Sequence, residues 1–374
     1  MDLAQATPWL ERLEALIDLE HVRRTSALQR AAFGFEPVPH VPTAILYSVP
    51  EDEWPRYSFP EIYADPVKML LHELADIYAS ARLGDDRLYG IRANYGTGII
   101  ASMFGAPTVV FEDTLPIGQA VSSAALEKIL ESDPPEPYSG VAGRALETVA
   151  LYREALAPYP KLSQAVGSQM LDIQGPFDNA TILWGSTIYY AFYDAPERLE
   201  RLMALIVDAI IGLVEEHRRL DGRPPQEHDG TWNHLGGLCV RNDSSVTLGP
   251  DQYRELVRPH DQRLLSPWGG WIHFCGRAAW WQELLEIPTL RGINPYQGEF
   301  YDLPSMYERC AAARVPIVQW TTPLNAECRE RIRTGFSRIV YAPNLEAAKR
   351  LLERLHATGH ADGEPGLTDE ERSP

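Results

Sequence analysis

Apolar residues recur along this chain with two different periods, and together the two periods predict alternating strands and helices. The clearest helical period covers residues 195–218, with Asp194 as a predicted N-cap and Glu197 completing a capping box. Its apolar residues form a single stripe: Leu199, Leu202, Met203, Ile206, Ile210, Leu213 and Val214. A second amphipathic helix is predicted over 66–82, and shorter ones over 303–313 and 323–334.

Short apolar runs between these helices predict strands. The predicted strands are 43–47, 89–94, 107–111, 169–174, 236–241, 270–275, 289–294, 314–320 and 337–341. Strands that alternate with helices favour a parallel sheet with right-handed crossovers. About eight such units in this length predict an α/β protein built as a (β/α)8 TIM barrel. A doubly wound open sheet is the alternative.

The pattern also predicts how the chain is divided. Residues 1–36 read as an N-terminal helical extension, 37–358 as the barrel and 359–374 as a polar, disordered tail. No internal repeat is visible. Because no GxGxxG or GxxxxGK[ST] follows a strand, the sequence does not indicate nucleotide binding.

The composition of the chain limits the binding partners and the cellular compartment that we expect for it. The chain has 374 residues, a net charge of −18, 45% hydrophobic residues and four cysteines. The negative charge argues against nucleic acid or an anionic membrane as a partner. With no basic segment leading into an apolar core, no secretory signal is expected, and so few cysteines suit a reducing cytoplasm. A small-molecule substrate is the expected partner.

Several predicted strands end in polar residues. These residues are Asn94, Gln174, Asp243, His273, Cys275, Asn294 and Gln319, with Trp320 next to the last of them. Each by itself is more commonly a cap or a turn residue. If the strands are parallel, however, their carboxyl ends share one face, where barrel active sites lie. We therefore expect Asn94, Gln174, Asn294, Gln319 and Trp320 to bind substrate.

The sequence His273-Phe274-Cys275-Gly276 closes one of these strands. Residues two apart in a strand point to the same side, so His273 and Cys275 would project together, and an imidazole with a thiolate suits zinc. The alternative is a core histidine beside a buried free cysteine. Catalytic zinc usually has three protein ligands, and Glu299 or Cys328 could supply the third. Cys310 and Cys239 are expected to be structural.

The segment around this motif resembles the uroporphyrinogen decarboxylase superfamily. The resemblance rests on Asp243, on Leu248-Gly249-Pro250-Asp251-Gln252-Tyr253 running into Leu256-Val257-Arg258-Pro259-His260, and on the His273–Gly276 motif. Gln174-Gly175-Pro176-Phe177 resembles an earlier Gly-Pro strand end of the superfamily. The resemblance covers roughly residues 40–355 and implies a (β/α)8 barrel.

The superfamily has two main chemistries. One branch decarboxylates a tetrapyrrole without a cofactor, but its arginine-rich N-terminal segment and its late Gly-His-Gly motif are absent here. The other transfers a methyl group between a corrinoid and a thiol held on zinc, with a His-x-Cys pair and a later cysteine as ligands. His273 and Cys275 match the pair, whereas the later cysteine, expected near 339–343, is absent.

The resemblance therefore implies zinc-dependent methyl transfer, with the corrinoid as substrate or on a partner protein. His273 and Cys275 would bind the metal, and Asp243 would orient a ligand or handle a proton. Two alternatives stay open. A cofactor-free decarboxylase would use Arg92, Arg241 and Arg277 to hold carboxylates, and a non-catalytic barrel would only bind a corrinoid or small molecule.

Overall fold

The computed structural model describes residues 2–222 and 235–361. The predicted tail therefore lies largely outside the described residues. Among those residues, no helix is long and apolar enough to cross a membrane.

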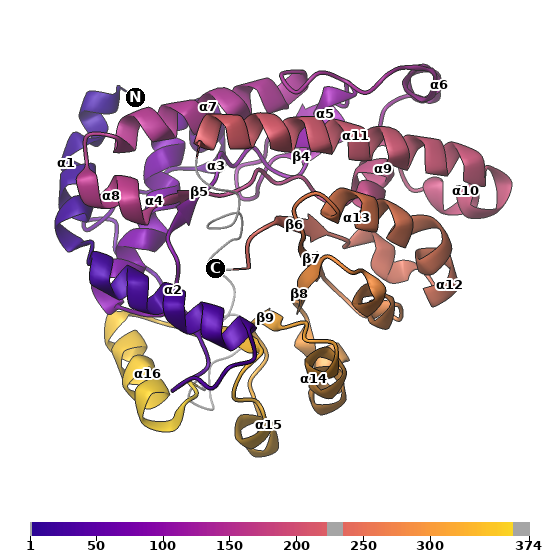
Figure 1. The fold of residues 1–374 in the computed structure, drawn as a ribbon. Helices are drawn as coiled ribbons and strands as arrows, with labels where there is room; N and C mark the ends of the chain where they lie inside the picture. Colours follow the sequence, from indigo (N-terminus) through magenta and orange to yellow (C-terminus); the bar gives the residue numbers. More distant parts are fainter. Residues whose placement is uncertain (1, 223–234, 362–374) are drawn as a thin grey trace.

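A six-stranded parallel sheet forms the centre of the molecule (Figure 1). Its order is β1 (Thr43–Tyr47), β10 (Phe336–Ala342), β9 (Ile317–Trp320), β8 (Leu290–Pro295), β7 (Gly270–Phe274) and β6 (Leu238–Arg241). Two further strands, β2 (Gly90–Ile91) and β5 (Gly167–Ser168), pair in parallel as a separate sheet. The α/β class is thus confirmed, while the strand ladders do not show a closed ring of eight.

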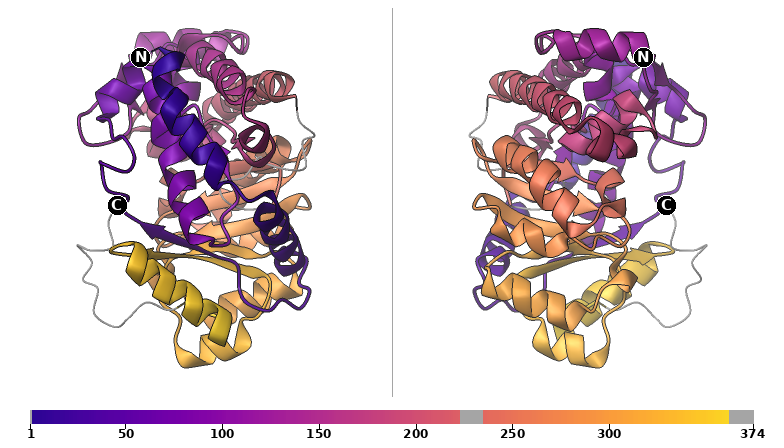
Figure 2. Two further views of the ribbon diagram at one scale, coloured as in Figure 1. Left: turned by 90° about the vertical axis from the view of Figure 1, so that its left-hand side faces the viewer. Right: turned by 90° about the vertical axis from the view of Figure 1, so that its right-hand side faces the viewer.

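Helices pack outside these strands (Figure 2). They are α3 (Phe59–Ala64), α4 (Pro66–Leu83), α5 (Ile99–Met103), α6 (Ser123–Glu131), α7 (Gly140–Leu156), α8 (Pro160–Ala165), α9 (Pro176–Trp184), α10 (Ile188–Asp194), α11 (Pro196–Asp221), α12 (Pro250–Gln252), α13 (Arg258–Leu265), α14 (Leu303–Ala312), α15 (Ala326–Arg331) and α16 (Leu345–Thr358). The predicted helices over 66–82 and 303–313 are α4 and α14, and the one over 323–334 is the shorter α15.

The N-terminal segment consists of two helices, α1 (Leu3–Leu16) and α2 (Leu19–Phe33). The chain leaves the first helix before Asp18, and the Asp18 side chain caps the N-terminus of α2 by accepting the Glu20 N–H. Helix α2 contacts the amino ends of the central strands. Gly335, just before β10, donates its N–H to Ala32 O at 2.7 Å, and Phe33 packs on Trp271 and Val318. The N-terminal segment therefore covers the end of the sheet opposite to the carboxyl strand ends.

Three local predictions are wrong. Residues 107–111 do not add a parallel strand, because β3 (Thr108–Val109) forms an antiparallel hairpin with β4 (Ile117–Gly118). The strand expected over 169–174 is displaced to β5, and the chain beyond it leaves the ladder, with Gln174 at a φ of 50°. Asp194 does not cap α11, since α10 continues through it and Pro196 starts the next helix after Ala195.

Strand register sorts the sheet into two faces. Val240, Ile272 and Ile293 align with one another on the face that packs against the main core. On the opposite, inner face, Cys239 aligns with Trp271, and one step further toward the carboxyl ends Arg241, His273 and Asn294 align. An apolar layer thus lies toward α2, and a polar layer lies at the carboxyl end.

Candidate metal centre

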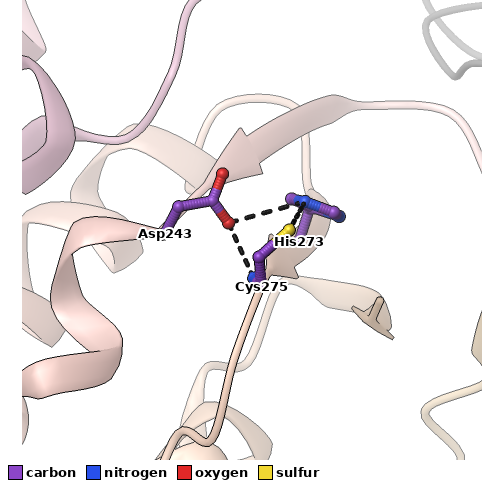
Figure 3. A group of neighbouring side chains, drawn as sticks. All are labelled: Asp243, His273 and Cys275. Carbon is purple, nitrogen blue, oxygen red and sulfur yellow. Dashed lines mark hydrogen bonds and ion pairs between the residues drawn. The ribbon is translucent and has the colours of Figure 1, made fainter. Parts of the chain in front are cut away.

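Asp243, His273 and Cys275 converge at the carboxyl ends of β6 and β7 (Figure 3). His273 is the next-to-last residue of β7, Cys275 directly follows that strand, and Asp243 lies two residues beyond the end of β6. The Asn242 N–H donates a hydrogen bond to His273 O at 2.8 Å, which holds the carboxyl ends of β6 and β7 side by side. One ligand atom from each of the three residues lies within 4.8 Å of the other two, and in the described part of the chain no other such group occurs.

The spacing of these atoms suits a tetrahedral ion. His273 Nε2 lies 3.2 Å from Cys275 Sγ and 3.5 Å from Asp243 Oδ1. Around zinc, bonds of about 2.0 Å to nitrogen and about 2.3 Å to sulfur place the nitrogen and sulfur about 3.5 Å apart, and nitrogen and oxygen about 3.3 Å apart. The Asp243 side chain is 38% exposed, against 14% for His273. Asp243 is therefore the more solvent-accessible of the two side chains.

Asn294 holds the His273 ring. Its Oδ1 lies 2.6 Å from His273 Nδ1, and its Nδ2 donates to Val318 O at 2.7 Å. Because that second bond uses the amide as a donor, Oδ1 is the acceptor and Nδ1 carries the proton. Nε2 then presents its lone pair toward Cys275 and Asp243. Asn294, which was expected to bind substrate, is 1% exposed, and its Oδ1 accepts the His273 Nδ1–H.

Burial keeps the imidazole and the thiol neutral. It lowers the pKa of His273, against the opposing effect of the Asp243 carboxylate. It also raises the pKa of Cys275 to about 12, with Asp243 adding to the effect. Since a cysteine binds a metal as the thiolate, a metal ion bound here would displace the thiol proton of Cys275. Gly276, at a φ of 98°, turns the chain away after the cysteine.

The carboxylate of Asp243 is fixed by backbone contacts. Its Oδ1 accepts the Cys275 N–H at 2.7 Å. Asp178, on α9, accepts the N–H groups of Asp243 and Ser244, each at 2.8 Å. Burial and the neighbouring Asp243 raise the pKa of Asp178 to about 8. Sequence reasoning assigned no role to Asp178, although its place just after the Gly175-Pro176 strand end was a signal.

A second polar cluster surrounds Asp172 and includes two of the expected substrate-binding residues. Asp172 accepts from Arg241 Nη1 at 2.5 Å, from Gln174 Nε2 at 2.6 Å and from Arg92 Nη1 at 3.3 Å. Burial would raise the pKa of Asp172, but Arg241 and Arg92 lower it below its usual value. Asn94 joins the cluster by accepting from Arg92 Nη2 at 3.2 Å. The cluster bridges β5 and β6, which share no ladder.

The other sequence candidates lie apart from the three-residue group. Gln319, at a φ of 55°, lines a cavity of about 10 Å³ with Gln29, Asp86 and Ser337. Trp320 is 2% exposed and packs against Phe336 with ring centres 6.0 Å apart.

The two proposed third ligands are also outside the group. Glu299 accepts from Thr322 Oγ1 at 3.4 Å, and Cys328 is buried in α15. Cys310 is buried in α14, and Cys239 lies in the apolar layer below Arg241. Asp243, rather than Glu299 or Cys328, thus lies beside His273 and Cys275.

Comparisons with known proteins place the fold. No protein-family model matches the chain, and no curated protein matches it. Among solved structures, it is similar to a methyltransferase from Methanosarcina mazei, with a TM-score of 0.60 and 16% sequence identity. The match covers 88% of this chain and 96% of that one. The chain therefore has a methyltransferase-like fold over nearly its whole length.

Proposed function

We propose that this protein is a zinc-dependent methyltransferase that moves a methyl group between a corrinoid and a thiol. The observation that carries the proposal is the convergence of Asp243, His273 and Cys275 at the carboxyl strand ends. The shared fold with a methyltransferase and the resemblance of residues 243–276 to the zinc branch of the uroporphyrinogen decarboxylase superfamily support it.

The donor set fits zinc. One nitrogen, one sulfur and one carboxylate oxygen form a three-ligand site that leaves a fourth position for a substrate. A zinc ion held by these three side chains would lower the pKa of a substrate thiol bound in the fourth position and hold it as the nucleophilic thiolate. In the proposed methyl transfer, the thiolate sulfur would form a bond to the methyl carbon as the carbon–cobalt bond of the corrinoid substrate breaks, with the electron pair of that bond left on cobalt.

The chain's own residues have separate tasks in this proposal. His273 offers Nε2 because Asn294 holds the proton on Nδ1. Cys275 gives its proton to solvent as it becomes a ligand, and Asp243 supplies an oxygen ligand. The corrinoid would be a free substrate or be carried by a partner protein.

The test pairs metal content with activity. The protein, purified without chelator, should contain close to one zinc per chain and transfer methyl from methylcobalamin to a member of a thiol panel. Cys275→Ser should lose at least about tenfold in zinc affinity. Cys310→Ser, which alters a buried cysteine of α14, is the matched control and should keep wild-type zinc content.

The alternatives have their own outcomes in the same experiment. Porphyrinogen decarboxylation without methyl transfer would replace the proposal with a carboxy-lyase. That reading has less support, because Arg92 and Arg241 already hold Asp172 and Arg277 is exposed. Tight corrinoid binding without turnover would indicate a binding protein. Equal zinc loss in both cysteine variants would refute the metal centre itself.

A further inference from the structure

Asp178 connects α9 to the metal centre through two backbone bonds. It lies in the first turn of α9, is 3% exposed, and uses both carboxylate oxygens. Oδ2 accepts the N–H of Asp243 and Oδ1 that of Ser244, both at 2.8 Å. Asp178 is not itself one of the three residues of the candidate metal centre.

The receiving segment is the start of the 3-10 helix η1 (Ser244–Thr247), of which Asp243 is the N-cap residue. An aspartate in that position commonly turns its carboxylate back to cap its own helix. Asp243 makes no such bond, and its φ and ψ of −68° and −38° are helical. Asp178 instead binds the N–H groups at this helix start, so the Asp243 carboxylate is left to face Cys275 N and His273.

The turn is also held from its other side. Tyr189 donates to Ser244 O at 3.1 Å, and Trp280 Nε1 donates to Ser245 O at 2.7 Å. These bonds support the backbone after Asp243, whereas among the described residues the N–H of Asp243 itself donates to Asp178. A carboxylate is costly here, because it is buried beside a second carboxylate. The helix N-terminus of α9 offsets part of that cost.

We infer that Asp178 is a positioning residue that holds the backbone of Asp243 so that its carboxylate completes the metal centre. The inference rests on the proposed function. It assigns to α9 the task of setting the third ligand, while β7 and the residue that directly follows it, Cys275, provide the other two.

The test is metal affinity in Asp178→Asn. The amide keeps one acceptor but turns an N–H₂ toward the second backbone N–H, so the turn at Asp243 loosens. We expect zinc affinity to fall by about 10- to 100-fold, the range for residues that orient metal ligands. Asp65→Asn is the matched control, since Asp65 accepts the N–H groups of Val67 and Lys68 on α4, and it should leave affinity unchanged.

Cobalt(II) provides a readout that a general loss of stability does not move. The visible Co²⁺ absorption should change in Asp178→Asn toward that of Asp243→Asn, and the double variant should bind no more weakly than Asp243→Asn alone. Wild-type affinity and an unchanged spectrum in folded Asp178→Asn would overturn the inference while leaving the proposed function intact. Absence of metal binding by the wild-type protein would overturn both.

A second variant guards against misfolding. Asp178→Glu keeps the charge but lengthens the side chain by one methylene, and the same loss of zinc affinity is expected. If neither variant folds, Asp178 serves the fold rather than the site, and the inference is wrong.

Discussion

At the scale of single residues, the chemistry of the centre depends on neighbours that hold a ligand without being one. Asn294 sets the tautomer of His273 with one amide atom and is itself anchored to Val318 O with the other. Each ligand can be tuned through such a partner, because a ring that rotates or a proton that moves to Nε2 removes the lone pair from the metal.

Asn294→Ala should therefore weaken zinc binding by about 10- to 100-fold. Asn294→Asp keeps an oxygen acceptor for His273 Nδ1 and should bind zinc more tightly than Asn294→Ala. A competition titration with a chromophoric chelator measures both constants. Equal affinity in the wild type and Asn294→Ala would show that the ring needs no anchor.

A second prediction at this scale concerns pH and stability. Asp261 is fully buried, accepting from Asn242 Nδ2 at 2.6 Å and from Tyr253 OH at 2.7 Å. Burial raises the pKa of Asp261 from 3.8 to about 7, so the folded state favours the protonated acid. Its stabilising contribution is complete below pH 4 and is lost as the pH rises from about 4 to 7.

The size of that loss is on the order of 4 kcal/mol, at about 1.4 kcal/mol per pH unit. Asp261→Asn should unfold with a free energy that depends less steeply on pH in this window. Urea denaturation at a series of pH values measures the difference. Parallel pH curves for the two proteins would exclude Asp261 as the titrating group.

At the scale of elements, the residue at which a helix begins determines which of its side chains pack on the neighbouring strands. Helix α16 begins at Asn344, whose side chain accepts the Ala347 N–H at 3.0 Å. Leu351 and Leu355 of this helix then pack with Ile45 and Val340, on the outer face of β1 and β10. The Asn344 cap therefore helps to keep α16 packed against the neighbouring strands β1 and β10.

Asn344→Ala should lower the free energy of unfolding by about 1 kcal/mol, because a backbone N–H loses its acceptor. Asn344→Gly should cost only a few tenths of a kcal/mol, since glycine also suits an N-cap. Chemical denaturation compares the two variants. An alanine variant as stable as the glycine variant would show that solvent replaces the cap.

At the scale of the whole molecule, the β2–β5 pair shares no described ladder with either edge strand of the six-stranded sheet, β1 or β6; the boundary between β5 and β6 is called the seam below. Side chains cross it instead. Asp172 accepts from Arg241 on one side and Arg92 on the other, and Asp178 binds the backbone beyond β6. Charged side chains close to the proposed metal centre thus connect the segments on the two sides of the seam.

Asp172→Ala should destabilise the protein by about 3 kcal/mol, because it leaves two partly buried guanidinium groups without their shared, buried counter-ion. Hydrogen exchange should increase in residues 167–175 and 238–242, on both sides of the seam. Glu346→Ala, which breaks the exposed pair with Lys349, is the control and should cost less than about 1 kcal/mol. Unchanged exchange at the seam would show that other contacts close it.

The sequence by itself determined the class of the fold and the pairing of His273 with Cys275. Both follow from local periodicity: apolar repeats specify helices and strands, and a period of two places both ligands on one side. The local sequence pattern gave wrong predictions at two places where an adjacent helix or strand determines the structure. Asp194 looked like a cap but ends α10, and 107–111 looked like a parallel strand but pairs as a hairpin.

Only the tertiary structure decided the third member of the centre. Asp243 lies 30 residues before His273 in the chain, and strand register together with Asp178 brings it to His273 and Cys275. The same register turned Asn294 toward His273, and folding paired Arg92 and Arg241 with Asp172. Contacts between residues far apart in sequence depend on how strands align and where buried charges find partners, and neither is encoded in a short window of the chain.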